Sequence, residues 1–167
     1  VNHEALVTSP QQFDFYDGGG LDFGFLGMAQ IDSMGNVNVS KFESQIPGCG
    51  GFPNITQNAE TVVYGGTLTA DGLEVDIGDG EIAIESEGQK RKFREELEQV
   101  TFSGAYATEI GQDVIYVTER GVFELREAGL TLVEVAPGMD PVEDIAAAME
   151  FEPEMANDIE EMDADIF

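Results

Sequence analysis

Apolar residues occur along this chain mainly in short runs or in alternation with polar residues, a pattern that favours β-strands over long helices. The first run, Leu21–Ile31, is predicted to form a mostly buried strand. After a turn at Ser33–Asn36, Val37–Ser40 is predicted to return as a second short strand. Further short strands are predicted at Glu60–Tyr64, Val114–Thr118, Val122–Leu125 and Leu130–Val135.

A β-hairpin is predicted in the middle of the chain. Leu73–Ile77 and Glu81–Glu85 both alternate apolar and acidic residues with the period of two that is typical of a strand. The dipeptide Asp79-Gly80 between them is a strong signal for a two-residue hairpin turn. We therefore expect a hairpin-rich segment at about residues 65–100.

Few helices are predicted to cover these strands. Asn54–Asn58 is one candidate, and Val142–Met149 is another, because Asp140 and Pro141 have the residue types of a helix N-cap and first helical position. Residues 153–167 form an acidic tail, for which a further helical turn or a frayed end is expected. Fully apolar strands are typical of a sheet covered on both faces, so part of the cover is expected to come from elsewhere.

Composition bounds the class of protein. The 167 residues include 34 acidic and 7 basic residues, for a net charge of −27, which argues against nucleic-acid binding. Two alternatives fit this charge: an acidic disordered interaction protein, or a folded protein adapted to high salt. The apolar fraction of 42% and the regular strand patterns favour the second.

The chain contains a single cysteine, Cys49, and a single histidine, His3, so neither a disulfide nor a zinc site is expected. No apolar stretch approaches the roughly 20 residues that span a bilayer, and no signal peptide is apparent. We therefore expect a cytoplasmic protein that does not act at a membrane.

Two glycine-rich segments are candidate binding loops. Gly18, Gly19 and Gly20, followed by Gly27 and Gln30, could present backbone N–H groups to a thioester carbonyl or a developing oxyanion. The alternative is a tight turn that needs positive φ. Gly48, Gly50 and Gly51 precede a predicted helix, where an anion such as pyrophosphate is stabilised, and a turn is again the alternative.

A basic cluster stands out in this acidic chain. Four of the seven basic residues fall within five positions, Lys90–Arg94. Such a cluster could contact phosphate groups or the acidic face of a partner subunit. The alternative is a solvated strand edge that is protected by charge. Lys41 and Arg120 are isolated basic residues and further candidate phosphate contacts.

Read together, several segments resemble the C-terminal half of a family I coenzyme A transferase of the propionate/acetate, short-chain acyl type. They are QFDFYDGGGLD at 12–22, FLGMAQID at 25–32, GNVNVSKF at 35–42, IPGCGGFPNITQNAE at 46–60, TFSG at 101–104, YVTERGVFEL at 116–125 and LTLVEVAPGMD at 130–140. The match runs in order along nearly the whole chain.

The resemblance implies an α/β fold that is part of an open, mixed or parallel-sheet domain and is incomplete on its own. Residues 1–152 would be the CoA-site part of that domain, with the hairpin insertion at about 65–100, and residues 153–167 an acidic tail. In such enzymes a glutamate attacks an acyl-CoA thioester, a glutamyl-CoA thioester forms, and CoA then moves to a second carboxylate. We expect that glutamate, and the N-terminal half, to lie upstream of this chain, so no catalytic residue is assigned in it.

The family's site residues carry over by position. Gly18, Gly19 and Gly20 match the loop that faces the catalytic glutamate, with Gly19 as the preferred N–H donor. Gly27 and Gln30 match the strand that follows. Gly48, Gly50 and Gly51 match the second glycine loop near CoA, and the candidate phosphate contacts are Lys41, Lys90, Arg91 and Lys92.

The resemblance also implies partners. They are acyl-CoA, a short-chain carboxylate, the N-terminal half and a second copy of the complete protein. CoA would be a co-substrate, with no tightly bound cofactor and no metal. Two alternatives remain: a catalytically dead fragment that acts only when assembled with its missing half, and a non-enzymatic acidic β-rich binding module.

Overall fold

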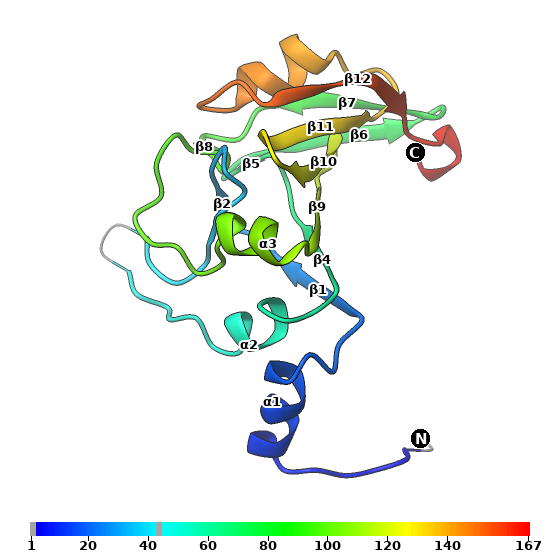
Figure 1. The fold of residues 1–167 in the computed structure, drawn as a ribbon. Helices are drawn as coiled ribbons and strands as arrows, with labels where there is room; N and C mark the ends of the chain where they lie inside the picture. Colours follow the sequence, from blue (N-terminus) through cyan, green and yellow to red (C-terminus); the bar gives the residue numbers. More distant parts are fainter. Residues whose placement is uncertain (1–2, 43–44) are drawn as a thin grey trace.

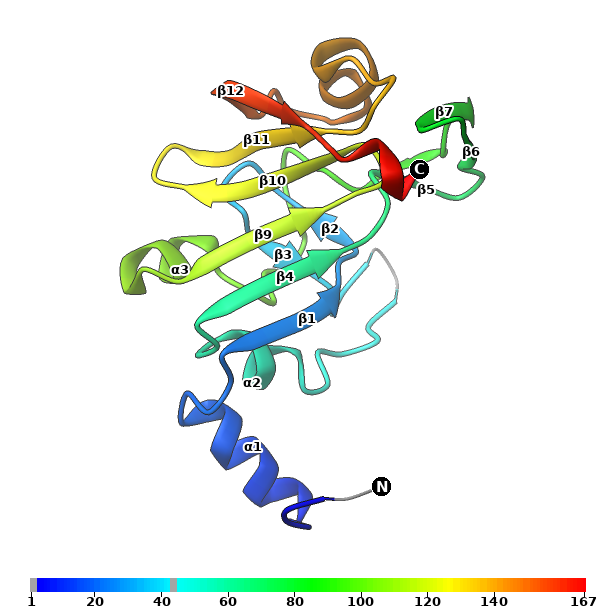
Figure 2. The same ribbon diagram turned by 90° about the vertical axis from the view of Figure 1, so that its right-hand side faces the viewer.

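The computed structural model describes residues 3–42 and 45–167, and its centre is a six-stranded mixed sheet (Figures 1 and 2). The strands, in their order across the sheet, are β1 (Phe23–Gly27), β4 (Thr61–Gly65), β9 (Asp113–Val117), β10 (Gly121–Arg126), β11 (Gly129–Val135) and β12 (Glu154–Glu161). The first three strands are parallel, β9, β10 and β11 form an antiparallel meander, and β12 runs parallel to β11. The predicted mixed-sheet α/β class is confirmed.

Two short helices and a small hairpin cover one face of this sheet. Helices α2 (Phe52–Thr56) and α3 (Gly104–Ile110) lie with the β2 (Gln30–Ile31) and β3 (Val37–Asn38) pair on the same side of β1, β4 and β9 (Figure 1). The core beneath them is aromatic, because Tyr64 stacks on both Phe52 and Tyr116. The predicted helix at 54–58 and the predicted strand at 60–64 are confirmed, each displaced by one or two residues.

The opposite face of β1, β4 and β9 is open within the described residues. Phe25, Val63 and Ile115 are in register across the three strands and form an apolar row. Phe23 and Phe25 are 60% and 74% exposed. The prediction of one mostly buried strand at 21–31 was therefore wrong, because β1 is covered on one side only and ends at Gly27, after which β2 pairs with β3 instead.

The predicted hairpin is confirmed. Strands β6 (Glu74–Gly78) and β7 (Glu81–Ser86) pair antiparallel, and the flanking β5 (Thr69–Ala70) and β8 (Lys90–Arg91) pair in the same way. Asp79 and Gly80 have φ of 55° and 82°, and a type I′ turn requires positive φ at both central residues.

Most of the C-terminal segment, for which a helical turn or a frayed end was predicted, is instead strand β12 (Glu154–Glu161), and a single 3-10 turn follows at Ala164–Ile166. Leu132 of β11 pairs with Met155, but Glu134 pairs with Glu160, so extra residues bulge from β12 between the two pairs. This bulge disrupts the period of two and leaves apolar residues at Met155, Ile159 and Met162, a spacing that imitates a helix.

The predicted helix at 142–149 exists as two consecutive turns. η1 (Pro141–Ile145) is π-helical and η2 (Ala146–Ala148) is a 3-10 turn. The Asp140 side chain accepts hydrogen bonds from the Val142 and Glu143 N–H groups at 2.8 Å, which confirms the predicted N-cap. A final 3-10 turn, η3 (Ala164–Ile166), ends the chain.

Two helices were not predicted, α1 (Ser9–Asp17) and α3. The Gln11 side chain accepts a hydrogen bond from the Thr8 N–H at 3.1 Å, as in a capping box, and the Ser103 hydroxyl caps α3. Helix α1 has no buried residue and projects from the body of the fold (Figure 2). Within the described ranges, no helix has the length and apolar character needed to cross a membrane.

Candidate functional site

The predicted site residues lie at opposite ends of β1. Gly18, Gly19 and Gly20 precede the strand, whereas Gly27 and Gln30 lie at and beyond its carboxyl end. The five residues of β1 alone span about 16 Å at about 3.3 Å per residue. The structure therefore does not bring these two groups of predicted residues together.

The triple glycine closes helix α1. The N–H groups of Gly18, Gly19 and Gly20 donate to the carbonyl oxygens of Asp14, Tyr16 and Phe15 at 2.9–3.0 Å. Gly19 has φ of 79°, which a side chain would strain. This arrangement favours the tight-turn alternative. An oxyanion role for Gly19 would require one of these bonds to open, and it stays a prediction.

The second glycine segment lies against helix α1, which the triple glycine closes. Asn58, just after α2, donates from Nδ2 to the Asp17 carbonyl at 2.7 Å, and a Cβ on Gly51 would come within 2.8 Å of the Phe13 ring. Gly48 and Gly50 have φ of 82° and 53° and open space where a Cβ would lie.

Fewer backbone N–H groups of this second loop are hydrogen-bonded to protein carbonyl oxygens than in the first loop. The Gly48 N–H donates to the Ser40 carbonyl at 3.3 Å. Among residues 3–42 and 45–167, no protein carbonyl accepts from the Gly50 or Gly51 N–H. These two N–H groups remain candidate donors to a ligand.

A cavity of about 520 Å³ lies at the carboxyl ends of the parallel strands. Its walls are Met28, Ala29, Gln30, Phe42, Gln45, Ala70, Lys90, Arg91, Lys92 and Arg94. Open α/β sheets bind ligands at this edge. The structure thus places four predicted site residues, Gln30, Lys90, Arg91 and Lys92, around one cavity. Lys41 lies on the neighbouring loop and is not part of the wall.

Most of the basic residues of this cavity, which we call the basic pocket, already have partners. Lys90 Nζ lies 3.1 Å from Asp71, with both side chains more than half exposed. The Arg91 guanidinium donates to the carbonyl oxygens of Ala147 and Met149 at 3.1 and 2.9 Å, so it fastens β8 to η2.

Arg94 is paired as well. Its Nε lies 2.9 Å from a Glu150 oxygen, an ion pair without the alignment of a directed hydrogen bond.

Lys92 differs from its neighbours. Within the described residues its ammonium group has no hydrogen bond and no ion pair. The group occupies the space beside Gly66, where a Cβ would approach Lys92 Nζ to 2.7 Å. Burial lowers the pKa of Lys92, and the Glu119 carboxylate partly offsets that shift. Backbone bonds to Leu68 and Ile31 hold Lys92 at the sheet edge.

The orientation of Gln30 is fixed by a buried neighbour. Asn38 is fully buried, and its Nδ2 donates to Gln30 Oε1 at 2.8 Å and to the Lys41 carbonyl at 2.7 Å. Since its oxygen is occupied, the amide nitrogen of Gln30 is the group left to donate into the basic pocket.

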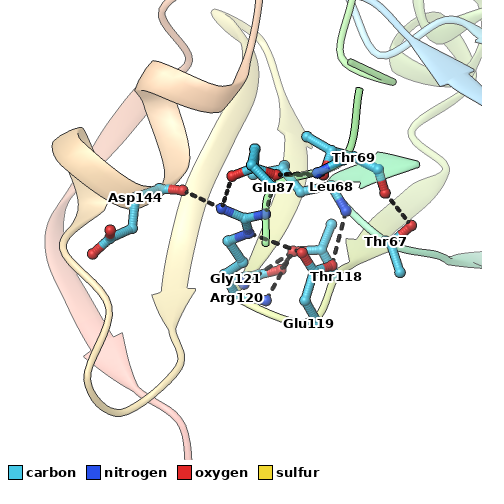
Figure 3. A network of polar contacts seen from close by, with 10 residues as sticks. Thr67, Leu68, Thr69, Glu87, Thr118, Glu119, Arg120, Gly121 and Asp144 are labelled. Atoms are coloured by element: carbon cyan, nitrogen blue, oxygen red, sulfur yellow. Dashed lines mark hydrogen bonds and ion pairs between the residues drawn. The ribbon is translucent and has the colours of Figure 1, made fainter. Parts of the chain in front are cut away.

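A second polar cluster is centred on Arg120 (Figure 3). The sequence did not predict that these residues come together. The Arg120 side chain is 1% exposed. It forms a bidentate pair with Glu87 at 2.8 and 2.9 Å, and it donates to Glu119 Oε1 at 2.8 Å and to the Asp144 carbonyl at 2.9 Å. The guanidinium of Arg120, named from the sequence as a candidate phosphate contact, is therefore already held by protein oxygens.

The charges of this cluster stabilise one another. Burial acts to lower the pKa of Arg120, but the hydrogen bonds and the charge attraction from Glu87 and Glu119 together outweigh burial and raise it. The Arg120 hydrogen bond is the main cause of the lowered pKa of Glu87. The cluster also reaches the basic pocket, because Glu119 Oε2 accepts from the Leu68 N–H at 2.8 Å and the Leu68 carbonyl accepts from the Lys92 N–H at 3.3 Å.

Comparison with known proteins finds CoA-transferases that match along the whole chain. No protein-family model matches the chain. The caffeate CoA-transferase of Acetobacterium woodii is 47% identical over 171 residues, which cover 99% of this chain and 32% of that protein. The crystal structure of the acyl-CoA transferase YdiF apoenzyme from Escherichia coli O157:H7 superposes with a TM-score of 0.96 at 46% identity, over 100% of this chain and 32% of that one.

A second structure of YdiF, described as a thioester complex with CoA, also superposes with a TM-score of 0.96 at 46% identity, over 100% of this chain and 33% of that one. The chain therefore spans about a third of the length of these relatives.

Proposed function

We propose, from the premise that this chain is a C-terminal-type segment of a family I CoA-transferase, that the complete protein transfers CoA from a short-chain acyl-CoA to a carboxylate. The observation that carries the proposal is the match to CoA-transferases along the entire chain, at 46–47% identity and a TM-score of 0.96. The same match removes the support for an unrelated β-rich binding module.

The proposed reaction proceeds in two halves. A glutamate carboxylate outside these 167 residues attacks the thioester carbonyl, so a mixed anhydride forms and CoA thiolate leaves. The thiolate then attacks the glutamyl carbonyl and releases the first carboxylate, which leaves a glutamyl-CoA thioester. A second carboxylate reverses these steps and departs as the new acyl-CoA. We propose acetate and propionate as substrates.

The part of the site in this chain would bind CoA as a co-substrate. The Gly50 and Gly51 N–H groups have no carbonyl partner within the described residues, so they can donate to a polarised carbonyl oxygen. The Gly18–Gly20 turn, in contrast, would act through its packing, since its N–H groups close α1.

The open sheet face is proposed to pack against the rest of the complete protein. Phe23 and Phe25 are exposed beside the row of Val63 and Ile115, and large apolar patches of this kind mark interfaces. The relatives are about three times as long as this chain, so they contain the residues that could supply this cover. We expect residues 1–167 alone to lack turnover, because the attacking carboxylate is supplied from outside them.

The test is CoA transfer from propionyl-CoA to acetate, with acetyl-CoA measured by chromatography. The complete protein should produce acetyl-CoA, and residues 1–167 alone should not exceed the protein-free control. Transfer by the isolated chain would contradict the proposed division of the site. Absence of transfer by the complete protein with these and other short-chain acids would contradict the proposed activity.

A further inference from the structure

Helix α1 has no buried residue, yet specific contacts attach it to the body of the fold. Isolated helices shorter than about 12–15 residues are marginal in water, so a helix of nine residues depends on such contacts. Among residues 3–42 and 45–167, every side-chain hydrogen bond between α1 and another element goes to α2 or to the segment just after it. The polar contacts of α1 therefore converge on the helix that follows the second glycine loop, residues 48–51.

Two residues of α1 make the contacts. Asp17, at the end of the helix, accepts from Asn54 Nδ2 with its two carboxylate oxygens at 3.0 and 3.1 Å, and its carbonyl oxygen accepts from Asn58 Nδ2 at 2.7 Å. One turn earlier, the Phe13 ring lies against Gly51, where a Cβ would come within 2.8 Å of Cε1 and 3.0 Å of Cζ. Phe13 and Asp17 are four residues apart, so one face of α1 contacts both the loop and α2.

The loop beneath this face contains the free backbone donors of the candidate site. The N–H groups of Gly50 and Gly51 have no carbonyl acceptor within the described residues. Glycine is conformationally permissive, so these donors keep one direction only if their neighbours restrain the loop. Donors that are already oriented stabilise charge developing in a transition state, because they need not reorganise during the reaction. The contacts from Phe13 and Asp17 supply such a restraint.

We propose that α1 orients the second glycine loop for the reaction, with Phe13 and Asp17 as positioning residues. This inference rests on the proposed CoA-transferase function, in which Gly50 and Gly51 donate to a polarised carbonyl oxygen. It gives the Gly18–Gly20 turn a purpose, because the turn closes α1 directly after Asp17. It also explains why Gly51 lacks a side chain, since a Cβ there would displace the Phe13 ring.

The experiment changes the pair of Asp17 and Asn54 in the complete protein. Asp17→Ala and Asn54→Ala each remove the side-chain hydrogen bonds, and the double variant removes both partners. Asp17→Asn combined with Asn54→Asp exchanges donor and acceptor, so it restores a hydrogen bond with the polarity reversed. Asp14→Ala is the matched control, because Asp14 lies on the same helix and its carboxylate has no hydrogen bond or ion pair within the described residues. Phe13→Ala tests the second contact.

Asp17→Ala, Asn54→Ala and Phe13→Ala should each lower kcat and kcat/KM for propionyl-CoA by about fivefold or more. KM should stay within about twofold, because a misdirected donor weakens the transition state more than the bound substrate. The double variant should lose no more than either single variant, and the exchanged pair should recover to within about twofold of wild type. Asp14→Ala should match wild type.

Three kinetic results would overturn the inference. They are wild-type kcat in Asp17→Ala, a loss confined to KM, and an exchanged pair that is as impaired as the single variants. The last result would mean that Asp17 acts through its charge and not through the hydrogen bond to Asn54.

Amide hydrogen exchange of the complete protein separates this inference from the proposed activity. Peptides that span residues 49–58 contain N–H groups bonded within the loop and α2 at 2.9–3.1 Å. They should exchange at least about threefold faster in Asp17→Ala than in wild type or Asp14→Ala, whether or not the protein turns over. A fall in kcat without faster exchange would contradict action through the loop.

The two proposals can fail separately. If exchange changes as expected but the wild-type protein transfers CoA to no short-chain acid, the activity proposal fails and the positioning of the loop stands. If transfer occurs but Asp17→Ala changes neither exchange nor kcat, the positioning fails and the activity stands.

Discussion

Removing the Arg120 guanidinium should destabilise the fold more than removing any exposed cation. The perturbation is Arg120→Met, which keeps most of the aliphatic length and deletes the charge. It leaves two carboxylates, Glu87 and Glu119, and the Asp144 carbonyl without their four hydrogen bonds.

The magnitude follows from the exposure of the partners. Breaking a buried ion pair by removing one partner typically costs about 3–5 kcal/mol. Glu87 is 47% exposed and can be rehydrated, whereas Glu119 is 13% exposed and remains largely desolvated. We therefore expect a loss of about 3 kcal/mol in the free energy of unfolding, the lower end of that range.

The assay is urea unfolding at constant salt, with Arg126→Met as the control. Both variants lose one positive charge, so the change in net charge is the same. Arg126 and Glu124 are 48% and 43% exposed, and such pairs contribute about 0–1 kcal/mol. With an m-value of about 1–3 kcal/mol/M, Arg120→Met should lower the midpoint by roughly 1–3 M with m unchanged. Equal midpoints for the two variants would refute the reasoning.

Three further predictions concern pH, salt and the glycine turn. The pKa of Glu87 is lower in the folded state, so the pairing of Glu87 with Arg120 stabilises the fold above the unfolded pKa of about 4.3, and this stabilisation is lost as pH falls through the folded pKa. The stability advantage of wild type over Glu87→Gln should therefore shrink below about pH 4.3. An advantage that persists at lower pH would contradict this. With a net charge of −27, the Tm should rise with KCl as the Debye length falls from about 10 Å at 0.1 M to 3 Å at 1 M, and a Tm independent of salt would count against adaptation to high salt. Gly19→Val should lower the free energy of unfolding by roughly 1–3 kcal/mol, because φ at Gly19 is 79°. Calorimetry and turnover are measured on the complete variant protein. If Gly19 only forms a turn, turnover falls in proportion to the folded protein lost; if its N–H binds an oxyanion, turnover of the folded variant falls about 10²–10³-fold.

Local signals in the sequence predicted local structure well. The Asp79-Gly80 turn and the alternating residues on either side specify the β6–β7 hairpin within a dozen residues, and the structure confirms it. The Asp140 cap was visible for the same reason. Helix α1 had a comparable signal in Thr8 and Gln11, but its apolar residues form no buried face, so periodicity did not indicate it.

Features that depend on distant contacts could not be predicted in this way. Strand β12 is held by β11 across a bulge that hides its period of two. Arg120 and Glu87 are 33 residues apart, and nothing near either residue indicates their pairing. The burial of β1 was overestimated, since the apolar pattern of that strand suits a sheet covered on both faces, whereas the described residues cover one.

The candidate site was predicted by residue type but not by arrangement. The glycines and the lysines were predicted to belong to one CoA site. In the structure, the length of β1 separates the Gly18–Gly20 turn from the basic pocket. The difference between Lys92 and its neighbours depends on tertiary partners, namely Asp71 for Lys90 and the carbonyl oxygens of Ala147 and Met149 for Arg91.

The most direct test of the central claim is the mass of the complete protein after incubation with propionyl-CoA. A family I mechanism predicts a covalent adduct equal to CoA minus one water, located on a glutamate outside residues 1–167 and lost when acetate is added. Transfer of CoA to acetate without any such adduct, or an adduct on a residue of this chain, would contradict the account.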